Sequence, residues 1–294
     1  MDDIAERALR EAIFERLRRM VREHEFVTRQ QLWNFEIDGA VLHLVDWSRG
    51  IRNPAEMNGT LSILSDPNGK YPDQQLPGGL FAYSYREGNT DGDNRKLRSA
   101  FELRLPMILF RKISDGIFVP IFPVYVVQDD AENRRFLIAV DEALRSISNP
   151  INPKPLEKEY AARIVNQRLH QPEFRGKVLR AYESQCAICN LKHPQLLDAA
   201  HIIADGKPHG TPTVDNGLSL CKIHHAAYDS NLLGINPDYE VVISPELLKD
   251  EGGPMLKHGL QEMDGRQLFV PSKRRDRPSR ERLEERFADF LKAN

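Results

Sequence analysis

Residues 186–229 read CAICNLKHPQLLDAAHIIADGKPHGTPTVDNGLSLCKIHHAAYD and contain all three cysteines of the chain. The segment begins with a C-x2-C pair, Cys186 and Cys189, and ends with a C-x2-H pair, Cys221 and His224, followed by a second histidine. Ligands separated by two residues on tight turns can reach one ion from the same side, and tetrahedral Zn²⁺ takes four of them. The spacing predicts a structural Cys3His zinc site, because four protein ligands leave no position for substrate. Buried thiols without a metal are the alternative.

Three more polar residues, His201, Asn216 and His225, are interleaved with these pairs. Their order and spacing, together with the paired ligands, resemble the HNH endonuclease motif over about residues 174 to 235. The resemblance implies a ββα-metal nuclease domain, in which a strand carries His201 and a helix carries His225.

The resemblance also implies a catalytic role for each of the three residues. His201 would be the general base for the attacking water, because an imidazole with a reference pKa near 6.5 is largely neutral at physiological pH. His225 would hold a divalent cation, Mg²⁺ or a similar ion, against the scissile phosphate. Asn216 would brace the loop that presents His201, through side-chain hydrogen bonds to the backbone.

One position departs from the family pattern. Many members carry Asp directly before the base as a second metal ligand, whereas this chain has Ala200. Asp198 lies two residues earlier and on a strand would point to the same face as Ala200, so we expect it to be the substitute ligand. Asp215 and Asp229 are alternatives, although either could instead brace a turn.

The rest of the chain predicts a second domain of another class. At 294 residues the chain is longer than one core usually supports. An amphipathic helix is predicted over 4–21, followed from about 36 to 141 by short or alternating apolar runs typical of a curved or closed β-sheet. Three prolines within 146–155 predict a linker. We therefore expect an α+β protein with domains over 1–145 and 157–294, joined by a linker over 146–156.

The predicted β-rich domain contains a series of short motifs in a fixed order. They are Trp47–Pro54, Gly59–Leu64, Tyr71–Asp73, Phe81–Tyr85, Asp93–Leu97 and Asp115–Phe118. The series resembles the SRA (YDG) domain over about residues 45 to 128. That family folds as a curved, barrel-like β-sheet and binds a flipped, modified cytosine.

The second resemblance implies a base pocket. Tyr83 would stack on the extracted base and Asp73 would accept from the cytosine amino group, with Tyr85 and Trp47 as walls. Such contacts can offset the few kcal/mol that unstacking a base costs. The alternative is that these aromatic side chains belong to an ordinary sheet core. The expected contacts to the DNA backbone are Arg52, Arg86, Arg95 and Lys96.

Composition sets the class of protein and its setting. A hydrophobic fraction of 40% and a charged fraction of 29% describe a soluble globular chain rather than a disordered one. The chain has neither a signal-like start nor an apolar run of about twenty residues, so we expect a cytoplasmic protein without a membrane partner. An odd cysteine count in that setting argues against disulfides.

Together these features predict a modification-dependent endonuclease, similar to modification-dependent restriction enzymes, that cuts double-stranded DNA carrying a modified cytosine. Two other functions stay open: a zinc-stabilised DNA reader without catalysis, and an HNH nuclease acting on unmodified DNA or RNA. A homodimer is also open, because one HNH site cuts one strand per event.

Overall fold

The computed structural model describes residues 1–294 except 25, 68–73, 77–79, 86–91, 148 and 150–151. The chain forms two compact units, Met1–Glu173 and Phe174–Asn294, and the fold class is mixed α and β. The division falls past the segment 146–156 that the sequence suggests as a linker. None of the helices that the structure describes combines the length and the apolar character that a bilayer crossing needs.

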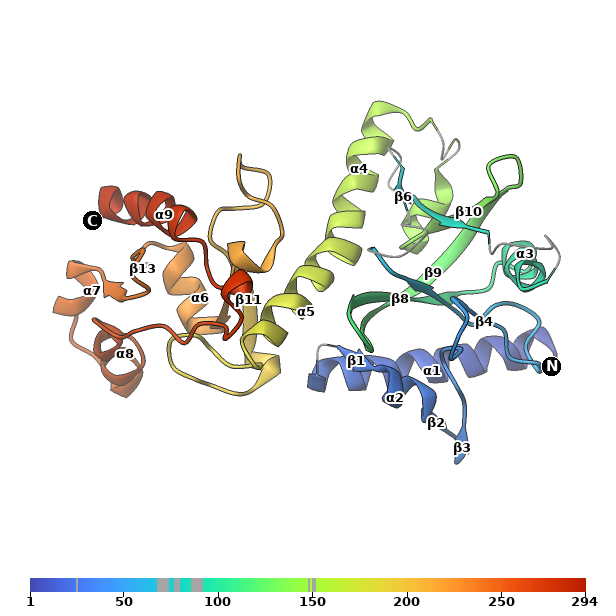
Figure 1. Ribbon diagram of the computed structural model, residues 1–294, viewed down its shortest axis with the longest axis horizontal. Helices are drawn as coiled ribbons and strands as arrows, with labels where there is room; N and C mark the ends of the chain where they lie inside the picture. Colours follow the sequence, from blue (N-terminus) through green and yellow to red (C-terminus); the bar gives the residue numbers. More distant parts are fainter. Residues whose placement is uncertain (25, 68–73, 77–79, 86–91, 148, 150–151) are drawn as a thin grey trace. The chain divides into compact units, whose positions relative to one another are not determined.

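The first unit is built on a curled, half-barrel sheet (Figure 1). Its described strands follow the order β4-β5-β8-β9-β10-β7-β6, and β1 also pairs with β9. The pair β5 and β8 is parallel and the others are antiparallel. The strands are β1 Val27–Thr28, β4 Ile51–Arg52, β5 Ser62–Ser65, β6 Gln74–Gln75, β7 Phe81–Ser84, β8 Met107–Ser114, β9 Ile117–Asp130 and β10 Arg135–Ala139, with a separate hairpin of β2 Glu36–Ile37 and β3 Ala40–Val41.

Both faces of this sheet are buried, and β8 shows why. Successive side chains of a strand point to opposite faces, so Met107 and Leu109 join one core while Ile108 and Phe110 join another. In Figure 1, α1 runs along one side of the sheet and α4 lies on the other. The helices and helical turns of this unit are α1 Asp3–His24, α2 Arg29–Trp33, α3 Asn94–Glu102, η1 Glu142–Ser146, α4 Pro155–Val165 and η2 Asn166–His170.

The segment after the expected linker packs into the first unit. Ala161, Val165 and Leu169 are buried in the same core as Leu109 of β8. A π-helical turn, η2, joins α4 to α5 (Gln171–Ala181). Apolar packing of α4 and η2 on the sheet therefore explains why the division between the units comes after residue 173.

A fully buried ion pair within α1 takes part in a hydrogen-bond network that connects this helix to the residues just before β5 and β8. Arg10 Nη2 lies 2.6 Å from Glu6 Oε1, and both side chains are 0% exposed. The Arg10 guanidinium also donates to the carbonyls of Gly59, Thr60 and Pro106 at 2.6–3.0 Å. These bonds satisfy the buried cation, which would otherwise carry a large desolvation penalty.

Arg10→Met is expected to lower the free energy of unfolding of the first unit by about 3–5 kcal/mol, because it leaves the Glu6 carboxylate buried without its partner. Both tryptophans of the chain lie in this unit, so urea unfolding followed by tryptophan fluorescence measures the effect. Arg18→Met is the matched control, since the Arg18–Glu15 pair on the same helix is 41% and 55% exposed and should contribute under about 1 kcal/mol. Equal losses in both variants would contradict the prediction.

The second unit is centred on a short ββα arrangement. Strands β11 (Leu197–His201) and β12 (Gly217–Cys221) pair antiparallel, and α6 (Lys222–Asp229) follows β12 directly. The register places Leu197 opposite Cys221, and His201 opposite Gly217. The remaining elements are η3 Pro194–Leu196, η4 Val214–Asn216, β13 Leu233–Ile235, β14 Val241–Ile243, α7 Pro245–Lys249, α8 Pro254–Gly259, η5 Gln261–Met263, η6 Arg274–Asp276 and α9 Arg280–Ala293.

Candidate metal centre and active site

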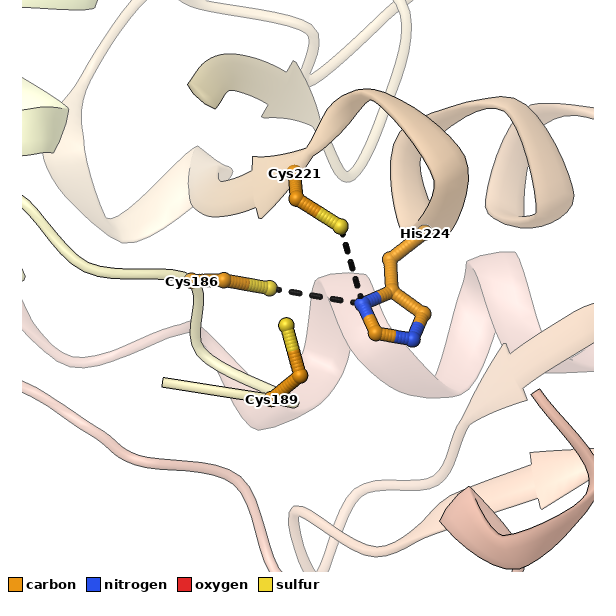
Figure 2. Close-up of side chains that lie close together, drawn as sticks. All are labelled: Cys186, Cys189, Cys221 and His224. Carbon is orange, nitrogen blue, oxygen red and sulfur yellow. Dashed lines mark hydrogen bonds between the residues drawn. The ribbon is translucent and has the colours of Figure 1, made fainter. Parts of the chain in front are cut away.

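Cys186, Cys189, Cys221 and His224 converge on one point (Figure 2), and their ligand atoms all lie within 4.8 Å of one another. His224 Nδ1 is 3.4 Å from the sulfur of Cys186 and 3.2 Å from that of Cys221. In a tetrahedral site with Zn–S near 2.3 Å and Zn–N near 2.0 Å, two such ligand atoms lie roughly 3.5 Å apart. The cluster could therefore hold a metal ion.

Local structure brings these four ligands together. Cys186 and Cys189 lie on a tight turn, in which Asn190 N donates to Cys186 O at 3.0 Å. Cys221 caps α6, and His224 lies in the first turn of that helix. The other ring nitrogen of His224, Nε2, is 2.8 Å from Gly259 O. Because a carbonyl only accepts, Nε2 carries the proton and Nδ1 keeps its lone pair for a metal.

His201 ends β11, and its ring is held by an aromatic neighbour. Phe174 stacks on it with ring centroids 4.0 Å apart and an interplanar angle of 13°. The opposite residue, Gly217, is required by this packing. A Cβ there would lie 2.4 Å from Val178 Cγ2 and 3.0 Å from the Phe174 ring. Phe174 could not be assigned to the site from the sequence, because an apolar residue at helical spacing looks the same in any core.

Burial sets the protonation state of His201. Its Nε2 atom is buried and has no hydrogen-bond partner among the described residues. Burial lowers the pKa of His201 below its ordinary value, and the nearby His225 acts in the same direction, outweighing the opposite effects of the Asp205 and Asp229 carboxylates. The imidazole is therefore neutral at pH 7, as a general base must be.

Asn216 is fully buried and holds the loop that follows His201. Its Oδ1 accepts from Ile203 N at 2.9 Å, and its Nδ2 donates to Ile203 O and Thr211 O, each at 3.0 Å. The backbone adds a bond from Ile202 N to Asn216 O at 2.9 Å. One side chain thus fixes both ends of the segment between β11 and η4.

His225 lies between two carboxylates. Its Nδ1 is 3.4 Å from Asp198 Oδ2, and its Nε2 is 3.3 Å from Asp229 Oδ2. His225 and Asp229 are four residues apart on α6 and therefore share a face of the helix. The spacing of His225 and Asp229 is present in the sequence, which predicts Asp229 only as an alternative to Asp198 for the second metal ligand.

Asp198 forms ion pairs with two cations. Its Oδ1 lies 2.9 Å from Arg175 Nη1 and 2.7 Å from Lys222 Nζ. Burial raises the pKa of Asp198, but the hydrogen bonds from Lys222 and His225 and the nearby positive charges outweigh it and hold that pKa below its usual range. Asp198 is thus a carboxylate in contact with the His225 ring. Sequence reasoning missed Arg175 and Lys222 because isolated basic residues carry no spacing signal.

The aromatic residues expected to form a base pocket differ in exposure. Tyr83 and Tyr85 are 7% and 5% exposed and belong to the core of the first unit. Tyr83 donates to Gly50 O at 3.0 Å, and Tyr85 bonds Asp129. Trp47 is 66% exposed. Asp73 and Arg86 lie outside the described residues.

Trp47 is part of an aromatic cluster with Trp33 and His43. Trp33 stacks on His43 with centroids 4.0 Å apart and meets Trp47 edge-on at 5.5 Å. Of the expected backbone contacts, Arg52 donates to His43 O at 2.8 Å and Arg95 is exposed. Lys96 Nζ donates to Met57 O at 2.7 Å and to Pro54 O, and burial lowers its pKa.

Comparisons with known proteins agree with the geometry of the second unit. Residues 186–236 match the family HNH_2, described as HNH endonuclease. No curated protein matches the chain. Among solved structures, "Modification dependent TagI restriction endonuclease" is similar at 17% identity with a TM-score of 0.30, covering 89% of this chain and 90% of that chain.

A second solved structure, "Structure of the Type IV phosphorothioation-dependent restriction endonuclease ScoMcrA", is similar at 16% identity with a TM-score of 0.22. The match covers 58% of this chain and 47% of the other, so this chain spans about half of that length. The family match and the residues gathered around His201 lead to one conclusion. Residues 186–236 form an HNH endonuclease domain, and the protein is a nuclease.

Proposed function

We propose that the protein is an endonuclease for double-stranded DNA carrying a modified cytosine, with a reader in the first unit and the HNH site in the second. The observation that carries the catalytic half is the neutral, partly buried His201 on the same ββα arrangement as His225. The reader half rests on the resemblance of residues 45–128 to the SRA domain.

In the proposed reaction, His201 takes a proton from the water that attacks the phosphorus atom. Because Nε2 is buried, Nδ1 is the nitrogen left to take it. Phe174 keeps the ring in place by stacking, and Asn216 fixes the segment that follows it. The protein thus supplies a base that is positioned before the substrate binds, which reduces the entropic cost of the reaction.

His225 Nε2 and the Asp229 carboxylate are the ligands we propose for a divalent cation, Mg²⁺ or a similar ion. Their separation of 3.3 Å fits two neighbouring ligands, each about 2.1 Å from one ion. Such an ion, when bound, stabilises the charge that develops on the phosphate and on the leaving oxygen. Asp198, which the sequence predicts as the substitute metal ligand, is proposed to accept from His225 Nδ1 and to set the orientation of the ring.

Zinc is the metal we propose for the Cys3His cluster, because thiolates with one imidazole are typical ligands of structural Zn²⁺. With this assignment the two metals have separate roles. His224 would bind the structural ion, and its neighbour His225 would bind the catalytic ion.

In the reader, Trp47 is the aromatic with an open face. Its ring, backed by Trp33, can stack on an extracted base and contribute about 1–3 kcal/mol. Tyr83 and Tyr85 would support this wall from within the core, Asp73 would meet the amino group of the cytosine, and Arg52, Arg86, Arg95 and Lys96 would contact phosphates. A homodimer would place two HNH sites on the two strands of one duplex.

Cleavage of matched duplexes tests the proposal. Duplexes identical except for plain, methylated, hydroxymethylated or bulkier cytosines are incubated with the full chain and Mg²⁺, with a chelator control. Cutting of one modified class and sparing of the plain duplex is expected. Trp47→Ala should reduce this preference, while Phe101→Ala, an exposed aromatic of α3, should not. Equal cutting of all duplexes would refute the reader and leave the nuclease intact.

The acid limb of the pH profile should report His201. A base whose pKa is lowered stays unprotonated to more acidic pH, so the midpoint of the limb is expected below 6.5, the ordinary value for histidine. The measurement is single-turnover nicking between pH 5 and 8 with the divalent ion saturating at each pH. A midpoint above 6.5 would mean that another group limits the reaction.

A further inference from the structure

A basic segment precedes α9 in the second unit and has no role in the site described above. Residues 273–280 contain five lysines and arginines and one aspartate. We call four of these cations, Lys273, Arg274, Arg275 and Arg277, the basic segment. All four are exposed.

Most of the positive charge of this segment is not neutralised by the protein. Lys273 and Arg274 form no ion pair within the part of the chain that the structure describes. Arg275, whose side chain is 81% exposed, is 3.6 Å from Asp276. Arg277 Nε donates to Pro271 O at 3.0 Å, which fixes its direction, and no carboxylate among the described residues pairs with it.

The basic segment is attached to the loop that follows His201. The turn η6 packs against η4, the turn that ends in Asn216. Just after the segment, Ser279 N donates to Asp215 O at 2.9 Å. Arg282 then donates to Asp215 Oδ2 at 2.6 Å and to Thr211 Oγ1 at 3.2 Å.

These bonds form a short path from the basic segment to the catalytic residues. Asp215 precedes Asn216, and Asn216 in turn binds Thr211 O and the backbone that follows His201. Backbone and side-chain hydrogen bonds therefore hold four exposed cations beside the loop that follows His201. An anionic polymer bound at His201 would pass close to them.

We propose that Lys273, Arg274, Arg275 and Arg277 bind the phosphate backbone of double-stranded DNA next to the cleaved bond. Contacts of this kind position the duplex and carry no sequence information, because every nucleotide presents the same phosphate. The inference rests on the proposed function in one respect, the identity of the polymer as duplex DNA. The inference gives the nuclease unit DNA contacts of its own, separate from the proposed reader in the first unit.

The salt dependence of DNA binding tests this assignment. The triple variant Lys273→Ala/Arg274→Ala/Arg275→Ala is compared with Lys249→Ala/Lys257→Ala/Lys292→Ala, which removes three exposed lysines outside the segment. Affinity of the full chain for one unmodified and one modified duplex is measured from 50 to 200 mM salt with no divalent ion added. Each lost phosphate contact should reduce the slope of log K against log salt by about 0.9, so up to about 2.7 for the first variant. The control should leave the slope unchanged.

The outcomes separate this inference from the proposed function. A reduced slope on both duplexes in the first variant alone supports the phosphate contacts, whether or not the protein prefers modified DNA. An unchanged slope, or equal reductions in both variants, overturns the inference and leaves the catalytic assignment intact. Loss of binding by misfolding is detected by circular dichroism and by hydrogen exchange of the β11 and β12 amides in both variants, because both tryptophans lie in the first unit.

Discussion

Replacing His201 with alanine is expected to slow DNA cleavage by about 10²–10⁴-fold, the usual contribution of a general base. The variant should still bind DNA, because the cations of the basic segment and the proposed reader are unchanged. The loss follows from the chemistry of the ring: alanine leaves the attacking water without an acceptor, and Phe174, which stacks on the His201 ring, cannot take its place. The measurement is single-turnover nicking of plasmid, beside a gel-shift assay of binding.

His209→Ala provides the matched control for this prediction. His209 lies on the same loop, its side chain is 75% exposed, and its nearest charged partner is Glu285 at 3.7 Å. We expect this variant to cut at the rate of the unchanged protein. Free imidazole should partly restore cutting by His201→Ala, since it can occupy the emptied space and accept the proton. Unimpaired cutting by His201→Ala would remove His201 from the catalytic role.

The local part of the site could be predicted from the sequence because its residues are fixed by short-range geometry. Cys186 and Cys189 share one turn, and His224 follows Cys221 on the first turn of α6. Ligand spacing therefore encodes the cluster directly. The helix that the resemblance implies for His225 is likewise present, as α6 (Lys222–Asp229).

Features that depend on packing could not be read from the sequence in the same way. Helix α3 lies inside the region interpreted as β-rich, although Leu97 and Ala100 are three apart and both buried. Nine residues are too few for helical spacing to stand out among strands. The Asp198 contacts with Arg175 and Lys222 join three separate elements, and no local pattern reports them.

Loss of one cysteine of the cluster is expected to unfold much of the second unit. Structural zinc contributes about 10–16 kcal/mol to the folding of zinc-finger peptides at pH 7, which exceeds the stability of most domains. Cys221→Ser removes a ligand at the junction of β12 and α6, so both the metal and the ββα arrangement should be lost. Elemental analysis should find one zinc per unchanged chain and far less in the variant.

Hydrogen exchange of the full chain localises this effect. Amides of β11 and β12 should lose protection in Cys221→Ser, while those of β8 and β9 keep it and the tryptophan-monitored unfolding of the first unit is unchanged. Ser219→Ala is the matched control, because Ser219 is buried on β12 and its hydroxyl has no partner among the described residues; its removal should cost little. A zinc-free unchanged protein with full protection in β11 and β12 would show that the cluster is a set of packed thiols. In that case the position of His225 would depend on α6 packing alone, and chelators would act only on the catalytic ion.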